Sequence, residues 1–163
     1  MTRARVAVAL GSNVGDRDSH LAFAAARLGA LLAGLTVSPF IDTAPVGVAP
    51  QGRFLNGAAV GWAENLSPRA VLDALLAIER DRGRERPHPG APRTLDLDLI
   101  LFGDTVLDEP GLHVPHPRFR ERRFVLEPLA RIAPEMRDPV TGKSVRDLLR
   151  ELGSLPESPE PAA

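Results

Sequence analysis

Cysteine is absent from the 163-residue sequence, which excludes disulfide bonds and cysteine-based zinc sites. An excess of either charge is also lacking. The net charge is −1, so the chain as a whole does not attract nucleic acid or anionic membranes, and any basic function must be local. No apolar run reaches the length of a membrane span, and the run Val6–Leu10 is too short for a signal sequence. We therefore expect a cytoplasmic protein that neither crosses a membrane nor binds nucleic acid.

The length and composition of the chain are typical of one globular domain. With 44% hydrophobic and 25% charged residues, the chain is long enough for a single core, and we place the domain at residues 1–153. Residues 154–163 are rich in proline and carry acidic side chains, so we predict a disordered tail. Arginines cluster within 80–93 and 118–123. Because Lys143 is the only lysine, the abundance of arginine indicates little by itself.

Hydrophobic periodicity and turn residues predict a βαββαβ order. This order is typical of the ferredoxin-like α+β fold, an antiparallel sheet with both helices on one face. Pro39 favours an edge position for the second strand. The predicted strands are 5–10, 35–42, 54–63 and a strand through Asp96 and Asp98; the predicted helices are 18–33 and 67–82, followed by an extended piece at 106–107 and helices at 124–132 and 145–152.

The fourth predicted strand carries two carboxylates, Asp96 and Asp98, after an arginine-rich loop. Because side chains alternate along a strand, these carboxylates project to one face and the leucines between them to the other. The pair needs a compensating cation, and Mg²⁺ suits it, since Mg²⁺ is usually held by one or two carboxylates together with substrate phosphates. Nearby guanidinium groups would hold the remaining phosphate charge. The sequence therefore indicates a site for metal-bound polyphosphate.

Other interpretations of this pattern stay open. The two aspartates could lie on the solvent face of an edge strand, but Leu99–Phe102 are typical of a strand buried on both faces. A ferredoxin-like fold also serves as an RNA-binding module, although no aromatic RNA-binding signature is found on a strand. Paired aspartates also occur in metal-dependent nucleases and nucleotidyl transferases. The glycine-containing turns 11–15 and 142–144 lack the full phosphate-loop motif.

Six short motifs occur in an order that is familiar from one enzyme family. They are Ala9–Asn13, Thr43–Gly47, Phe54–Asn56, Ala91–Asp98, Val114–His116 and Arg122–Phe124. With them the chain resembles the 6-hydroxymethyl-7,8-dihydropterin pyrophosphokinases, which transfer pyrophosphate from ATP to a pterin alcohol in folate biosynthesis. Three features depart from the family pattern: Pro89 replaces a basic residue, Phe54 replaces a frequent tyrosine, and the arginine loop has 89–91 where many members carry a tryptophan.

The resemblance implies a role for each motif. Asp96 and Asp98 would bind two Mg²⁺ ions and, with Arg84 and Arg93, form the catalytic set. The residues implied to contact ATP are Arg84, Arg93, Leu99, His116 and Arg122. The residues implied to contact the pterin are Thr43, Pro45, Val46, Phe54, Asn56 and Phe124. Taken without the resemblance, Phe54 and Phe124 would be read as ordinary core residues. We expect ATP and the pterin alcohol as substrates, and a monomeric enzyme.

Overall fold

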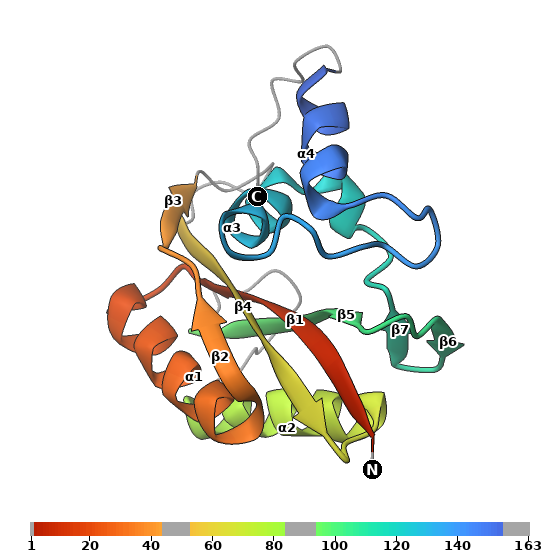
Figure 1. The fold of residues 1–163 in the computed structure, drawn as a ribbon. Coiled ribbons are helices and arrows are strands. Elements are labelled where there is room, and N and C mark those ends of the chain that lie inside the picture. Colours follow the sequence, from red (N-terminus) through yellow and green to blue (C-terminus); the bar gives the residue numbers. More distant parts are fainter. Residues whose placement is uncertain (1, 44–52, 84–93, 155–163) are drawn as a thin grey trace.

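The computed structural model describes residues 2–43, 53–83 and 94–154. In these residues an antiparallel sheet has the strand order β2, β4, β1, β5, and β3 pairs with β4 along the same edge as β2 (Figure 1). The strands are β1 (Arg3–Ser12), β2 (Ala33–Val37), β3 (Ile41–Thr43), β4 (Phe54–Glu64), β5 (Asp96–Phe102), β6 (Leu107–Glu109) and β7 (Leu112–Val114). The helices are α1 (Arg17–Leu31), α2 (Pro68–Asp81), the 3-10 turn η1 (Phe119–Glu121), α3 (Arg123–Ile132) and α4 (Val145–Ser154).

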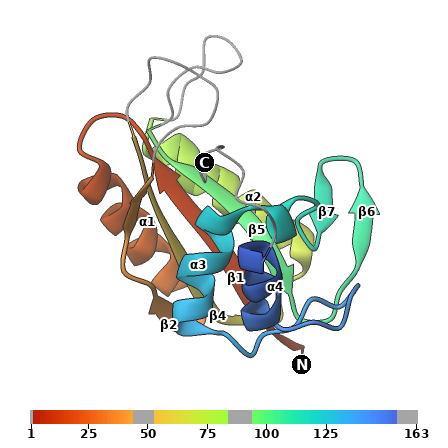
Figure 2. The same ribbon diagram turned by 90° about the horizontal axis from the view of Figure 1, so that it is seen from above.

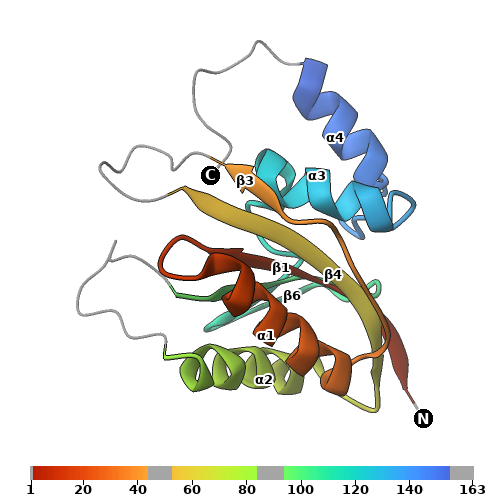
Figure 3. The ribbon, with the colours of Figure 1, turned by 90° about the vertical axis from the view of Figure 1, so that its left-hand side faces the viewer.

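The helices cover both faces of the sheet (Figure 3). α1 and α2 pack on one face, where Val8, Leu28 and Leu75 belong to one buried cluster. α3 and α4 lie over the other face, where Ile100, Leu126 and Leu148 belong to a second cluster. The strand order and the placement of α1 and α2 confirm the predicted ferredoxin-like α+β fold, with the two C-terminal helices added as a third layer.

Helix boundaries follow local capping. The side chain of Asp16 accepts a hydrogen bond from the Ser19 N–H and starts α1, and Ser67 does the same for α2 through the Ala70 N–H. Pro68 occupies the first turn of α2, where a missing N–H costs nothing. α4 extends through Ser154, the first residue of the predicted tail, and the rest of that tail lies outside the described residues. No described helix has the length and apolar character needed to cross a membrane.

The predicted second strand, 35–42, is two strands rather than one. β2 and β3 both pair with β4, and Ser38, Pro39 and Phe40 interrupt them. Pro39 has no N–H to donate, while the Ser38 hydroxyl accepts a hydrogen bond of 2.9 Å from the Ala58 N–H. The edge position predicted from Pro39 is confirmed, because β2 and β3 each pair only with β4 among the described strands.

β5 differs from the sequence expectation in its position. It lies at the end of the sheet, although Leu99 to Phe102 form a continuous buried run. Its outer edge is covered by other groups: the Glu79 carboxylate accepts a hydrogen bond from the Leu97 N–H at 2.7 Å, and the Ile100 carbonyl accepts one from the His116 N–H at 2.9 Å. The β6–β7 hairpin lies beyond this edge (Figure 2). Runs of buried residues therefore do not require a central strand when side chains cover the edge.

β5 also contains a bulge. Leu99 lies opposite Val8 and Leu101 opposite Ala7, so Ile100 has no partner on β1. As a result, Ile100 and Leu101 both belong to the cluster under α3 and α4, while Leu99 and Phe102 belong to the cluster under α1 and α2.

Candidate active site

The two aspartates of β5 lie at one end of the sheet, on the face covered by α3 and α4. Leu95, Leu97 and Leu99 are in the buried cluster under α1 and α2, so the predicted alternation is confirmed and the carboxylates project to the opposite face. Both aspartates are half-buried. The backbone between them is fixed by Glu79, whose buried carboxylate bonds the Leu97 N–H.

The sheet register brings Asn56 to the same face as these carboxylates. Asp96 lies opposite Gly11 of β1, and Gly11 lies opposite Asn56 of β4. Two strand spacings separate the two side chains, which corresponds to about 10 Å. Gly11 leaves the space between them open, because a Cβ atom at this position would come within 3.1 Å of the Asn56 Oδ1 atom. The carboxylate pair and the amide are therefore neighbours across one glycine.

Asn56, Thr43 and Phe54 form a second group of the predicted residues. The buried Asn56 donates from Nδ2 to the Thr43 hydroxyl at 2.6 Å, and that hydroxyl lies 3.5 Å from the Phe54 carbonyl oxygen. Thr43 and Phe54 are the last paired residues before the segment that connects β3 to β4, and both are half-buried. The contact with Thr43 fixes the orientation of the Asn56 amide.

His116 is attached to β5 through its backbone. Its N–H bonds the carbonyl of the bulge residue Ile100, and its Nδ1 atom accepts a hydrogen bond from the Arg118 N–H at 3.2 Å. Burial, followed by the charges of Arg122 and Arg118, lowers the pKa of His116 to about 4, against an opposing effect of Asp96. His116 is therefore neutral at pH 7, with its proton on Nε2.

Arg122 and Phe124 lie at the start of α3. Arg122 precedes the helix as its N-terminal flanking residue, and its guanidinium carbon lies 5.5 Å from the centre of the Phe124 ring. Both side chains are half-buried, unlike the fully buried Phe119. The charges of Arg122 and Asp96 both act on His116, so His116 lies near both of them.

Not every predicted residue joins this arrangement. The side chain of Leu99 is buried on the opposite face, under α1 and α2, so the structure separates it from the carboxylates. Arg84, Arg93, Pro45 and Val46 lie outside the described residues.

Sequence reasoning missed Glu79. The signal was present: Val71, Leu75 and Ile78 form the buried stripe of α2, and Glu79 lies beside them at helical spacing. A charged residue at a position that faces the core predicts a specific polar partner.

Sequence reasoning also missed Arg17, which contacts Asp42 and Arg53 from α1. No local pattern could have found contacts between residues so far apart in the sequence.

The donor set fits Mg²⁺ and does not resemble a closed zinc site. Among residues 2–43, 53–83 and 94–154, no group of three or more His, Asp or Glu side chains could hold a metal ion. Two half-buried carboxylates supply oxygen ligands and leave other coordination positions for water or phosphate. The fold and the site thus define an α+β domain with a polar sheet end suited to a metal-bound polyphosphate.

Comparison with known proteins agrees with this class. The family model described as 7,8-dihydro-6-hydroxymethylpterin-pyrophosphokinase matches residues 7–134, and the chain belongs to this family. A 2-amino-4-hydroxy-6-hydroxymethyldihydropteridine pyrophosphokinase of Pseudomonas aeruginosa is 45% identical over 147 residues, covering 89% of this chain and 90% of that protein. Proteins of the same name from Synechocystis and Bacillus subtilis are 43% and 42% identical, over 89% and 82% of this chain and 74% and 81% of their own lengths.

A solved structure shows the same fold at low sequence identity. The Plasmodium falciparum HPPK-DHPS wild type with pteroate superimposes with a TM-score of 0.70 at 14% identity, over 92% of this chain and 42% of that one. The likeness extends over nearly all of this chain and confirms the fold.

Proposed function

We propose that the end of the sheet around Asp96 and Asp98 is where this chain performs the reaction of its family. That reaction transfers pyrophosphate from ATP to the hydroxymethyl group of 6-hydroxymethyl-7,8-dihydropterin in folate biosynthesis, and AMP is released. The observation that carries the proposal is the sheet register that places Asp96 on the same face as Asn56, together with the charges of Asp96 and Arg122 that act on His116.

The polyphosphate end of the site consists of charges and one neutral donor. Asp96 and Asp98 would hold two Mg²⁺ ions bound with ATP, and these ions would shield the phosphate charge. His116 is neutral and donates from Nε2 to a phosphate oxygen, and Arg122 provides positive charge beside it. Arg84 and Arg93 supply further guanidinium groups. Phosphoryl transfer needs positioning and charge stabilisation more than a strong general base, which agrees with this set.

The pterin end of the site consists of an amide and aromatic rings. Asn56 pairs with the edge of the heterocycle, because its amide offers both a donor and an acceptor and Thr43 fixes its orientation. Phe54 and Phe124 offer ring faces for the flat pterin, and both are half-buried rather than sealed in the core. Backbone groups of Pro45 and Val46 complete this end. The pterin hydroxymethyl oxygen attacks the β-phosphorus of ATP, and the bond to the AMP oxygen breaks.

The location, oligomeric state and partners of the enzyme complete the proposal. We propose a cytoplasmic monomer that binds no nucleic acid. The net charge of −1 supports the last point, and the large hydrophobic side chains that are exposed in the described residues, Val14, Leu76, Val106 and Val140, are scattered over different elements. Light scattering after size-exclusion chromatography measures the oligomeric state, and a dimer would contradict this part.

The function is tested by incubating the protein with ATP, Mg²⁺ and the pterin alcohol and separating the nucleotides by chromatography. We expect AMP that depends on the pterin. Formation of ADP, or of AMP without the pterin, would contradict pyrophosphoryl transfer.

Removal of either carboxylate tests the site. We expect Asp96→Ala and Asp98→Ala to lower kcat by at least about a thousandfold, since charge stabilisation supplies most of the catalysis. The matched control is Asp108→Ala, which removes an exposed carboxylate from β6 and leaves kcat unchanged. Circular dichroism checks that each variant is folded. Near-normal turnover by both site variants would remove the carboxylates from the mechanism.

A further inference from the structure

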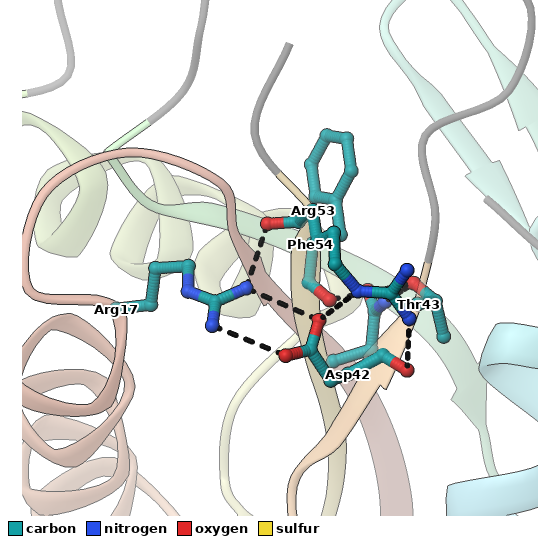
Figure 4. Close-up of polar contacts among 6 residues, drawn as sticks. Arg17, Asp42, Thr43, Arg53 and Phe54 are labelled. Atoms are coloured by element: carbon teal, nitrogen blue, oxygen red, sulfur yellow. Dashed lines mark hydrogen bonds and ion pairs between the residues drawn. The ribbon is translucent and has the colours of Figure 1, made fainter.

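An ion cluster joins α1 to the β3–β4 hairpin on the side away from the proposed pterin site. It consists of Arg17, at the start of α1, with Asp42 of β3 and Arg53, which precedes β4 (Figure 4). Asp42 lies opposite Leu55, a residue of the cluster under α1 and α2, whereas the next pair, Thr43 and Phe54, belongs to the other face. The ion cluster therefore lies on the sheet face opposite Thr43 and Phe54, the residues proposed to contact the pterin.

The guanidinium of Arg17 contacts both strands of the hairpin. It donates to the two Asp42 carboxylate oxygens at 3.3 and 3.2 Å, and to the Arg53 carbonyl at 2.8 Å. Arg53 adds a hydrogen bond of 3.0 Å from its Nε atom to the same carboxylate. The hydrogen bond from Arg17, more than the one from Arg53, holds the pKa of Asp42 below its usual value, so the carboxylate is charged at neutral pH.

These contacts end one residue before the proposed pterin residues. Asp42 directly precedes Thr43, and the Arg53 carbonyl belongs to the peptide bond that leads into Phe54. β3 has three residues and pairs with β4 alone among the strands that the structure describes, so its own ladder holds the hairpin end weakly. The Phe54 ring extends away from the ion cluster in Figure 4.

We propose that Arg17 is a positioning residue for pterin binding. By bonding Asp42 and the Arg53 carbonyl at once, it fixes the spacing of Thr43 and Phe54 and, through Thr43, the orientation of the Asn56 amide. This inference rests on the proposed function, because it assigns a role in the binding of that substrate. In this role Arg17 contacts neither ATP nor the pterin.

A purely structural role for Arg17 makes a different prediction. In that case its loss would loosen α1 on the sheet and affect all kinetic constants alike. The Arg27–Asp81 pair provides the comparison, because it also joins α1 to another element, α2, through an exposed ion pair with a distance of 2.7 Å, and neither residue belongs to the proposed site.

The experiment compares Arg17→Gln, Arg17→Lys and Asp42→Asn with Arg27→Gln in steady-state kinetics and in fluorescence titrations of the pterin. Exposed ion pairs and single hydrogen bonds are individually weak, so we expect Arg17→Gln to raise the KM and Kd for the pterin about 3- to 10-fold. The KM for ATP and kcat should stay within about twofold, because the carboxylates on β5 are unaffected. Arg17→Lys should recover only part of the loss, since one ammonium cannot replace the planar fork.

A double variant tests whether Arg17 acts through Asp42. We expect Arg17→Gln with Asp42→Asn to bind the pterin about as weakly as either single variant, because both remove the same connection. If Arg17→Gln is too unstable to measure, Asp42→Asn alone tests the same contact.

The outcomes separate this inference from the proposed function. If the unaltered protein forms no pterin-dependent AMP, the proposed function fails. If it does, but Arg17→Gln and Asp42→Asn bind the pterin like Arg27→Gln, or lose ATP and pterin affinity equally, the positioning role is wrong.

Discussion

Among single residues, His116 combines two unusual conditions, burial and nearby positive charge. Both disfavour its protonated form and bring its pKa to about 4. Between pH 6.5 and 4 the unfolded chain therefore binds a proton that the folded protein does not. Folded stability must then fall as the pH is lowered through this range, since stability rises with pH wherever the unfolded state holds more protons.

We predict that His116 titrates near pH 4 in the protein without nucleotide or metal. Histidine side-chain NMR measures the titration, and His116→Gln assigns the resonance. Urea unfolding between pH 6.5 and 4.5 gives a second measurement: the unaltered protein should lose more stability than His116→Gln. A titration midpoint near 6.5 would contradict the burial of this ring.

At the scale of elements, one buried carboxylate connects α2 to the edge of β5. Glu79 accepts the Leu97 N–H, and this peptide lies between the two aspartates. We predict that Glu79→Ala lowers the free energy of unfolding by about 1–3 kcal/mol, because a buried N–H loses its partner, and also lowers kcat. Glu79→Gln keeps an acceptor oxygen and should cost less.

Urea unfolding and amide hydrogen exchange at Leu97 measure this effect. Glu64→Gln is the control, because it changes an exposed glutamate at the end of β4 that forms an ion pair with Arg3. Equal losses of unfolding free energy from Glu79→Ala and Glu64→Gln would show that β5 does not need the hydrogen bond from Leu97 to Glu79 at its edge.

Helices and strands could be predicted from the sequence better than the contacts that surround them in the fold. Alternation along Leu95 to Leu99 predicted that the two carboxylates share the face opposite the leucines, and Ser67 and Pro68 predicted the start of α2. The edge position of β5 was not predictable, because its burial comes from Glu79 and the His116 backbone, which are distant in sequence. The break between β2 and β3 required knowing that the Ser38 hydroxyl replaces a missing strand contact. The roles of Arg84, Arg93, Pro45 and Val46 stay predictions.

At the scale of the whole molecule, the C-terminal region that carries α3 and α4 is held together by an ion pair between the buried Asp138 and the half-buried Arg120. Asp138 is fully buried and accepts hydrogen bonds from Arg120 at 2.9 Å, from the Thr141 hydroxyl at 2.8 Å and from the Val140 N–H at 3.0 Å. Burial alone would raise the pKa of Asp138, but these hydrogen bonds outweigh it and hold the pKa below its usual value. The pair connects η1 to the segment between α3 and α4.

We predict that Asp138→Ala lowers the free energy of unfolding by about 3–5 kcal/mol, because it leaves the Arg120 charge without its partner. A carboxyl with a lowered pKa stabilises the fold above its unfolded pKa, and this stabilisation is lost as the pH falls through the folded pKa. In an acid titration followed by circular dichroism, the unaltered protein should therefore unfold at a higher pH than its urea stability at pH 7 alone would predict. Asp147→Ala, an exposed change on α4, is the control, and an equally large loss there would contradict the assignment.

The bulge at Ile100 gives β5 one site where its length can change. Deleting Ile100 would place Leu101 directly after Leu99, and Asp98 would still pair with Ala9 and Phe102 with Val6. A deletion nearer either end would instead shift one end of the strand by a residue and turn its side chains to the wrong face. The deletion of Ile100 would, however, remove the carbonyl that holds the His116 backbone. In a library of single-codon deletions across β5, we therefore expect folded protein to survive at this codon and enzymatic activity to be impaired there.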